Sequence, residues 1–227
     1  MDLTSLGAVG YRADGKPDAL LVLAHGAGAG QQHPFMTAVA QGFAARRVDV
    51  VTFDFPYMRE RRKIPDKASV LEKAFADVVA AARPWSHATR FFIGGKSMGG
   101  RMATHLGAAH LEGLAGIVVF GYPLHPPGKP EQLRVQHLPS IVAPVLIVQG
   151  ERDAFGSPQE LKPAIETMTA KVTLHTVAKG DHSLAVAGRR RDEVLNGVLD
   201  VVVEWMRTED RRPGTGDRGS KTEDHGL

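Results

Sequence analysis

The chain has 227 residues, of which 43% are hydrophobic and 23% charged, and its formal net charge is +3. This length and composition favour one soluble globular domain, and no apolar run is long enough to span a bilayer. Cysteine is absent, which excludes disulfides, thiolate metal sites and cysteine nucleophiles. The first residues do not place a basic segment before an apolar one, so we expect no secretory signal and a cytoplasmic location.

Short apolar runs alternate with helical patterns along most of the chain. The expected strands cover residues 19–26, 48–56, 90–94, 115–120, 144–149 and 172–177, and the expected helices cover 34–46, 69–84, 98–108, 158–170 and 189–206. Pro34 suits the first turn of its helix, and Ser69 with Glu72 forms a capping-box pattern at the start of the next. This alternation predicts an α/β fold with a mostly parallel central sheet and helices on both faces.

The periodic pattern stops after Met206. Residues 207–227 are polar, with too few apolar side chains to offset the entropy of an ordered chain. We therefore predict one domain over residues 1–206 and a disordered polar tail over residues 207–227. Within the domain, the stretch between Phe120 and Ala143 is short and contains GYPLHPPGKP, so we expect a minimal loop there and no helical lid.

The stretch RFFIGGKSMGGRMATHL, residues 90–106, allows two interpretations. Gly95-Lys96-Ser97 could end a phosphate-binding P-loop, but that motif needs a glycine where the chain has Arg90. Gly95-Lys96-Ser97-Met98-Gly99 instead matches the G-x-S-x-G nucleophile elbow, which requires the strand, sharp turn and helix that this stretch predicts. The pentapeptide also arises by chance, so Ser97 is a candidate nucleophile only if its partners are present.

A serine nucleophile needs a histidine to accept its proton and a carboxylate to orient that histidine. In hydrolases with this elbow the partners follow in the order Ser, Asp, His, in loops after strands. Asp153 follows the strand that ends at residue 149, and His182 follows the last expected strand. Glu151 and Asp181 are rival carboxylates; Asp153 is preferred because the side chains of sequence neighbours such as Asp181 and His182 usually diverge.

The remaining parts of the expected site are donors for the oxyanion and groups that contact the substrate. One donor is the backbone N–H of Met98, and the second is that of Ala27 in the small-residue loop HGAGAG, with Gly28 as the fallback. We expect His25 to pack beneath this loop. Lys96 and Arg101 flank the nucleophile and are candidate substrate-binding residues, together with Gly28.

Other site classes lack support in the sequence. The histidines form no metal-binding cluster, so we predict no metal, and no motif indicates a cofactor. The basic cluster at residues 59–63 has neither the aromatic platforms nor the reading helix of a nucleic-acid site, so we expect no nucleic-acid partner and no membrane partner. This cluster follows an expected strand and could lie near the site. The oligomeric state is left open.

Several segments together carry a resemblance: HGAGAGQQHPFM, DFPYMRERRK, GGKSMGGRMA, GYPLHPPGKP, QGERDAFG and GDHS. The chain resembles the small bacterial α/β-hydrolase-family proteins related to dienelactone hydrolases, over residues 19–206. It is also similar to the hydrolase-like domain of a eukaryotic histone-acetyltransferase-complex subunit and to a testis-expressed protein. The resemblance implies the α/β-hydrolase fold and a triad of Ser97, Asp153 and His182. Dienelactone hydrolases use a cysteine nucleophile, so their lactone chemistry is not carried over.

The sequence therefore predicts a serine hydrolase of carboxylesterase type that cleaves small soluble esters through an acyl-enzyme. The alternative is an interaction module with this fold and a relict triad. An open cavity with Asp153 in place favours the enzyme, whereas a filled cavity or a displaced Asp153 favours the module.

Overall fold

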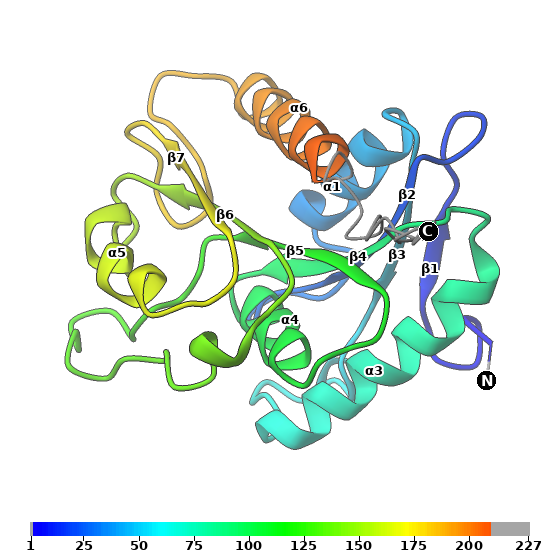
Figure 1. Ribbon diagram of the computed structural model, residues 1–227, viewed down its shortest axis with the longest axis horizontal. Helices are drawn as coiled ribbons and strands as arrows, with labels where there is room; N and C mark the ends of the chain where they lie inside the picture. Colours follow the sequence, from blue (N-terminus) through cyan, green and yellow to red (C-terminus); the bar gives the residue numbers. More distant parts are fainter. Residues whose placement is uncertain (1, 210–227) are drawn as a thin grey trace, which may run out of the picture.

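The computed structural model describes residues 2–209, which form a seven-stranded sheet (Figure 1). The strand order is β1-β3-β2-β4-β5-β6-β7, and every neighbouring pair is parallel except β1 with β3. The strands span Val9–Tyr11 (β1), Ala19–Ala24 (β2), Val48–Phe53 (β3), Phe91–Lys96 (β4), Leu114–Phe120 (β5), Val145–Gly150 (β6) and Val172–Val177 (β7).

Helices cover both faces of this sheet, as expected from the sequence. On one face lie α1 (Pro34–Ala44) and α6 (Arg191–Thr208); on the other lie α3 (Ala68–Trp85) and α4 (Met98–Ala108) (Figure 1). The shorter helices are α2 (Pro56–Arg59), the 3-10 helix η1 (Leu138–Ser140) and α5 (Pro158–Glu166). Because helices bury both faces, the side chains of β2, β3 and β6 are all buried, which explains why these strands are apolar except for Asp49, Thr52 and Gln149.

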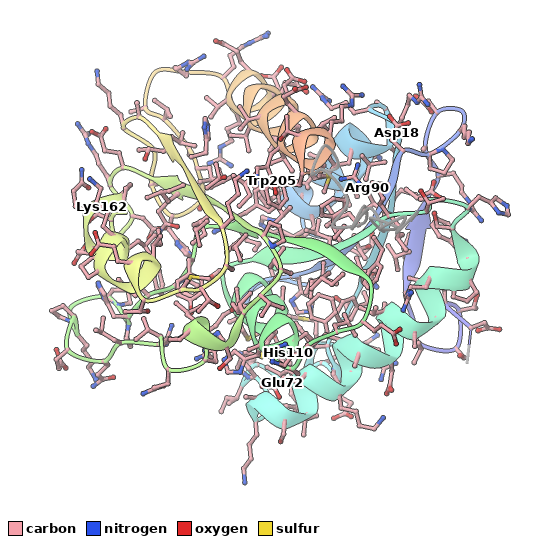
Figure 2. All side chains as sticks on the ribbon, viewed as in Figure 1. Asp18, Glu72, Arg90, His110, Lys162 and Trp205 are labelled. Carbon is pink, nitrogen blue, oxygen red and sulfur yellow. The ribbon has the colours of Figure 1, made fainter. Side chains whose placement is uncertain are left out.

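Two apolar cores result, one on each side of the sheet. Trp205 of α6 points toward the sheet (Figure 2) and packs on Phe92 of β4, with ring centroids 5.9 Å apart. A Cβ atom on Gly116 of β5 would lie 2.7 Å from the Trp205 ring, so the absence of a side chain there allows the contact. Burial of such a large side chain stabilises the fold by about 2 kcal/mol.

The chain direction across the sheet determines where a site can form. After β2 the chain moves outward to β3, and then crosses back to β4 on the other side of β2. Loops after β2 and β4 therefore leave the sheet at a switch point, the usual place for a ligand in such folds. Ala24 pairs with Gly95, which places the loop after β2 beside Ser97. Gly150 pairs with Val177, which brings the loops after β6 and β7 together.

One local prediction was wrong. Ser69 is not the N-cap of α3, because the helix begins at Ala68 and Lys67 occupies the cap position without a side-chain hydrogen bond. Glu72 does not close a capping box, because its carboxylate contacts Nδ1 of His105 in α4 at 2.9 Å. A capping box forms instead at α5, between Ser157 and Glu160.

Other expected boundaries differ by a few residues. Helix α5 ends at Glu166, whereas the sequence predicted residue 170, and the short elements β1 and α2 were not predicted. The connection from β5 to β6 contains only η1 in the described structure, which confirms the minimal lid. Helix α6 continues to Thr208, two residues past the predicted domain boundary, and the predicted tail lies outside the described residues from 210 onward. None of the helices in residues 2–209 is long and apolar enough to cross a membrane.

Candidate active site

Ser97 lies in the sharp turn between β4 and α4. Its φ of 52° and ψ of −114° fall where few non-glycine residues are found, and its N–H donates to the Phe120 carbonyl at 3.0 Å. The turn needs close packing of backbone on backbone: a Cβ on Gly95 would lie 2.6 Å from the Ala24 carbonyl oxygen. The glycine-rich sequence around Ser97 thus permits a strained backbone that presents its hydroxyl at the end of the sheet.

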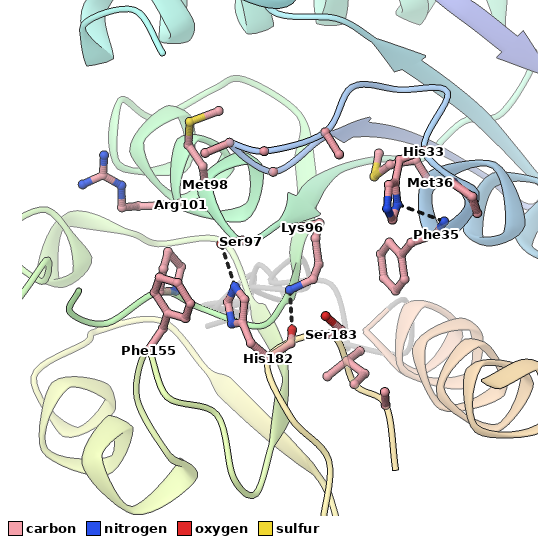
Figure 3. Close-up of a pocket in the computed structure, with 18 of the residues that line it drawn as sticks. His33, Phe35, Met36, Lys96, Ser97, Met98, Arg101, Phe155, His182 and Ser183 are labelled. Carbon is pink, nitrogen blue, oxygen red and sulfur yellow. Dashed lines mark hydrogen bonds between the residues drawn. The ribbon is translucent and has the colours of Figure 1, made fainter. Parts of the chain in front are cut away.

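The structure brings the three predicted triad residues together. Nε2 of His182 lies 2.9 Å from Oγ of Ser97, and Nδ1 of His182 lies 2.7 Å from Oδ2 of Asp153 (Figure 3 shows the first contact). An ionised carboxylate only accepts hydrogen bonds, so Nδ1 carries the imidazole proton and Nε2 accepts from the serine hydroxyl. This arrangement can remove the proton from Ser97 as its oxygen attacks a carbonyl carbon.

Asp153 is held on both carboxylate oxygens. Its exposed fraction is 4%; Oδ1 accepts from the N–H of Phe155 at 2.8 Å, and Oδ2 accepts from Nε2 of Gln149 at 2.9 Å. The two rival carboxylates stabilise loops instead. Asp181 accepts hydrogen bonds from two backbone N–H groups of its own turn, and Glu151 accepts one from the N–H of Lys179.

Gln149 is a residue that the sequence reasoning missed. It is fully buried at the end of β6, where its Oε1 accepts from the N–H of Tyr122 at 2.7 Å. Its Nε2 donates to Asp153, to the Tyr122 carbonyl at 3.2 Å and to the Gly156 carbonyl at 2.7 Å. The signal available in the sequence was one polar residue in an otherwise apolar buried strand, four positions before Asp153.

The loop after β2 presents backbone donors to the site. Nδ1 of His25 lies 2.7 Å from the Gly26 carbonyl oxygen, and the Tyr57 hydroxyl donates to the Ala27 carbonyl at 2.9 Å. In a trans peptide the N–H points opposite to the carbonyl, so the N–H groups of Ala27 and Gly28 point away from these partners. Within residues 2–209, the N–H groups of Ala27, Gly28 and Met98 donate no hydrogen bond, and all three residues line the cavity above Ser97.

His25 holds this loop as a neutral ring, in agreement with the structural role expected for it. The N–H of Phe55 donates to its Nε2 at 3.1 Å, so Nδ1 carries the proton that is donated to Gly26. Burial lowers the pKa of His25, against the opposing effects of the Gly26 carbonyl and Asp54. The imidazole therefore stays uncharged at neutral pH and acts as a fixed donor.

Lys96 lies beside Ser97, and its ammonium turns toward the histidine loop. Its Nζ donates to the backbone carbonyl of His182 at 2.5 Å (Figure 3). Burial lowers the pKa of Lys96 to about 8, although Asp153 and Asp181 act in the opposite direction. Lys96 thus connects the nucleophile strand to the histidine loop, while also lining the cavity.

The cavity above Ser97 has a volume of about 910 Å³. Figure 3 shows Arg101 on one side of Ser97, and Phe35 and Met36 on the other, where α6 adds further apolar side chains. None of the cations in the 59–63 cluster lines this cavity: Arg59 belongs to a separate hollow, and Arg62 pairs with Glu60 and Asp66. The cluster therefore does not line the cavity, although Arg62 contacts the cavity residue Asp66.

The comparison with known families agrees with this geometry. A family described as "Alpha/beta hydrolase domain" matches residues 17–207. The chain belongs to the α/β-hydrolase family. The match covers the whole of the described sheet except β1, and it confirms the fold class predicted from the sequence. The similarity to the two eukaryotic proteins stays a prediction.

Solved α/β hydrolases share the fold at low identity. A dienelactone hydrolase from Anabaena variabilis has 19% identity and a TM-score of 0.69, with 88% of this chain and 90% of that chain covered. Est1E from Butyrivibrio proteoclasticus, solved with bound ferulic acid, has 16% identity and a TM-score of 0.70, with 90% and 95% covered. An alpha-beta serine hydrolase homologue from Coxiella burnetii has 15% identity and a TM-score of 0.67, with 88% of both chains covered.

In this α/β hydrolase, the described residues contain no group of three or more histidine, cysteine, aspartate or glutamate side chains that could hold a metal ion. The polar groups beside Ser97 in the cavity include an imidazole, cationic side chains and backbone N–H groups that donate to no described residue. Such a set can activate a nucleophile and stabilise negative charge on oxygen.

Proposed function

We propose that this chain is a serine hydrolase that cleaves small soluble carboxylic esters through an acyl-enzyme. The observation that carries the proposal is the hydrogen-bonded series Asp153–His182–Ser97, which ends at a hydroxyl in an open cavity. The strained backbone of Ser97 adds support, because such strain is typical of functional positions.

In the first half of the reaction, Oγ of Ser97 attacks the ester carbonyl carbon while Nε2 of His182 takes the hydroxyl proton. The carbonyl oxygen becomes an oxyanion, which the free N–H groups of Met98 and Ala27 are placed to bind. Each such donor stabilises the transition state by about 3 kcal/mol. The intermediate then breaks its bond to the alkoxide, which receives the proton from His182 and leaves as the alcohol.

In the second half, water gives a proton to His182 and its oxygen attacks the acyl carbon. The bond to Ser97 breaks, the serine oxygen recovers the proton, and the carboxylic acid leaves. Asp153 stabilises the imidazolium in both halves and does not itself take the proton. The net reaction is ester plus water to acid plus alcohol.

The form of the cavity supports small substrates. The β5–β6 connection supplies only a loop with η1, so no helical cap covers the site in the described structure. The open cavity and the position of Asp153 also support the enzyme over the interaction module, which would be favoured by a filled cavity or a displaced carboxylate.

A fluorophosphonate probe tests the proposal directly, because it labels only an activated serine. We expect wild type to be labelled and Ser97→Ala to be unlabelled, with circular dichroism showing that both are folded. Ser183→Ala is the matched control, because Ser183 also lines the cavity and its hydroxyl makes no hydrogen bond with a described residue. Labelling that persists in Ser97→Ala, or folded wild type that is never labelled, would contradict the proposal.

A further inference from the structure

Arg101 is a cation in the cavity that has no hydrogen-bond or ion-pair partner for its side chain among the described residues. It lies one turn of α4 beyond Ser97, where its N–H donates to the Ser97 carbonyl at 3.0 Å. Its guanidinium makes no hydrogen bond and no ion pair with any residue in the described part of the chain. By contrast, Arg46 and Arg47 on the surface pair with Asp200 and Asp18. A guanidinium that lines a cavity and has no anionic partner among the described residues can bind an anionic group of a ligand.

A second arginine reaches the same side of the cavity from a different element. Arg134 comes from the β5–β6 connection, and its Nη1 donates to the Pro123 carbonyl at 3.3 Å. Burial lowers the pKa of Arg134, and repulsion by Arg101 lowers it further. No carboxylate of the described chain forms an ion pair with Arg134. Both guanidiniums therefore line the same cavity and repel each other, and neither has a carboxylate partner among the described residues.

The side chains around Arg101 do not supply the missing negative charge. The rings of His105 and His137 stack with centroids 3.8 Å apart, and Glu72 is bonded to His105. Burial lowers the pKa of His137 to about 3, with further lowering from His105 and Arg101. The Tyr122 hydroxyl is also neutral at physiological pH, because burial raises its pKa.

The cavity carboxylates are engaged elsewhere. Asp66 accepts from the N–H of Tyr57 and pairs with Arg62, and Asp192 on α6 pairs with Arg190. The side of the cavity near Arg101 thus carries excess positive charge, while the side near Phe35 and α6 is apolar (Figure 3).

Building on the proposed esterase function, we propose that Arg101 and Arg134 bind a carboxylate of the substrate, so that the preferred esters carry a carboxylate a few bonds from the scissile carbonyl. Arg101 follows Ser97 by one helical turn, about 5 Å along the axis of α4, and both residues line the same cavity, so one short substrate can contact both. The uncharged end of the ester then lies against the apolar side. Half-esters of short dicarboxylic acids have this form, as do acyl esters of short hydroxy acids.

Two pairs of esters test the subsite. Monoethyl glutarate is compared with neutral ethyl pentanoate, and 4-acetoxybutanoate with neutral pentyl acetate, by pH-stat assay at pH 7. We expect wild type to prefer the anionic member of at least one pair. Arg101→Met should reduce kcat/KM for that member by about 10- to 100-fold, the usual range for a lost hydrogen bond to a charged group, and should change the neutral member less than threefold. Arg134→Met should act in the same direction.

Two further variants make the test specific. Arg101→Lys keeps the charge but loses the planar pair of donors, so it should recover part of the preference. Arg61→Met is the matched control, because Arg61 is exposed and lies outside the cavity, and its replacement removes the same charge. A similar loss in Arg61→Met would assign the preference to the general field of the protein and overturn the subsite.

Failure of the subsite can be distinguished from failure of the esterase proposal. Equal hydrolysis of both members of each pair by wild type and Arg101→Met overturns the subsite and leaves the esterase in place. If no ester is hydrolysed, calorimetric titration of Ser97→Ala with monoethyl glutarate decides the matter. If Ser97→Ala binds monoethyl glutarate and the added Arg101→Met substitution abolishes this binding, the carboxylate subsite is supported although the esterase proposal fails. If Ser97→Ala does not bind it, the subsite is overturned as well.

Discussion

Replacing Gln149 with leucine should destabilise the protein and slow the proposed ester hydrolysis at the same time. Leucine has a similar volume, so the change mainly removes polar contacts. The amide of Gln149 serves the N–H and carbonyl of Tyr122, the Gly156 carbonyl and Oδ2 of Asp153, with its two N–H hydrogens shared among three acceptors. All of these contacts are buried, and Gln149 itself has an exposed fraction of 0%.

The size of the effect follows from the groups left without a partner. A buried donor or acceptor that loses its partner costs about 1–3 kcal/mol. Asp153 retains its contacts with His182 and Phe155, and the shared hydrogens make the three donated bonds weaker than three separate ones. We therefore expect Gln149→Leu to lower the free energy of unfolding by about 3–5 kcal/mol, a large part of the 5–15 kcal/mol typical of a domain.

Urea denaturation followed by circular dichroism measures this loss, and kcat on a short ester measures the second effect. We expect kcat to fall by about tenfold with little change in KM, because Asp153 loses one of the groups that hold it against His182. Gln132→Leu, at an exposed position in the β5–β6 connection, should change neither quantity. A loss of stability below about 1 kcal/mol in Gln149→Leu would refute the hydrogen-bond account.

Three other changes have defined outcomes. In urea titrations, the free energy of unfolding of Ser97→Gly should be about 1 kcal/mol higher than that of Ser97→Ala, because glycine accepts the positive φ without strain. Equal free energies of unfolding would argue against a strained elbow. Burial lowers the pKa of Lys96 from 10.5 to about 8, so between these values the folded protein binds fewer protons than the unfolded chain and its stability rises with pH. Between pH 7 and pH 10, the free energy of unfolding of wild type should therefore rise by about 2 kcal/mol relative to that of Lys96→Met. A difference that stays constant with pH would contradict the buried ammonium. Tyr57→Phe removes the donor to the Ala27 carbonyl and should cost about 1 kcal/mol of stability and about fivefold in kcat; unchanged steady-state kinetics would show that the loop holds its N–H groups without it.

The fold could be predicted well because its signals are local and repeated. Strands buried on both faces give short, mainly apolar runs, and the helices between them have one apolar face, so the periodicity separates them. The short strand β1 could not be found this way, since three residues hold no period and its pairing with β3 is set by tertiary contact. The capping-box prediction failed at Ser69 for a similar reason: Glu72 found a partner in another helix.

The candidate site could be predicted where chain order carries the information. Ser97, Asp153 and His182 each follow a strand in parallel order, so their carboxyl-terminal loops must meet at one edge of the sheet. The direction of a long side chain is not encoded in this way. Lys96 and Arg101 looked equivalent in sequence, yet the ammonium of Lys96 contacts the His182 carbonyl whereas the guanidinium of Arg101 has no partner among the described residues.

Because β7 lies at the edge of the sheet, heating should open it locally before the whole domain unfolds. Among the described residues this strand pairs only with β6, and five of its six residues are partly or fully exposed, yet it leads directly into the loop that carries His182. Amide protons of β7 should therefore exchange with solvent through local opening long before those of β2 and β4 in the middle of the sheet. Ser97 and His182 belong to regions of different local stability, so loss of the proposed activity on warming would begin with fraying at one edge while the rest of the fold remains intact.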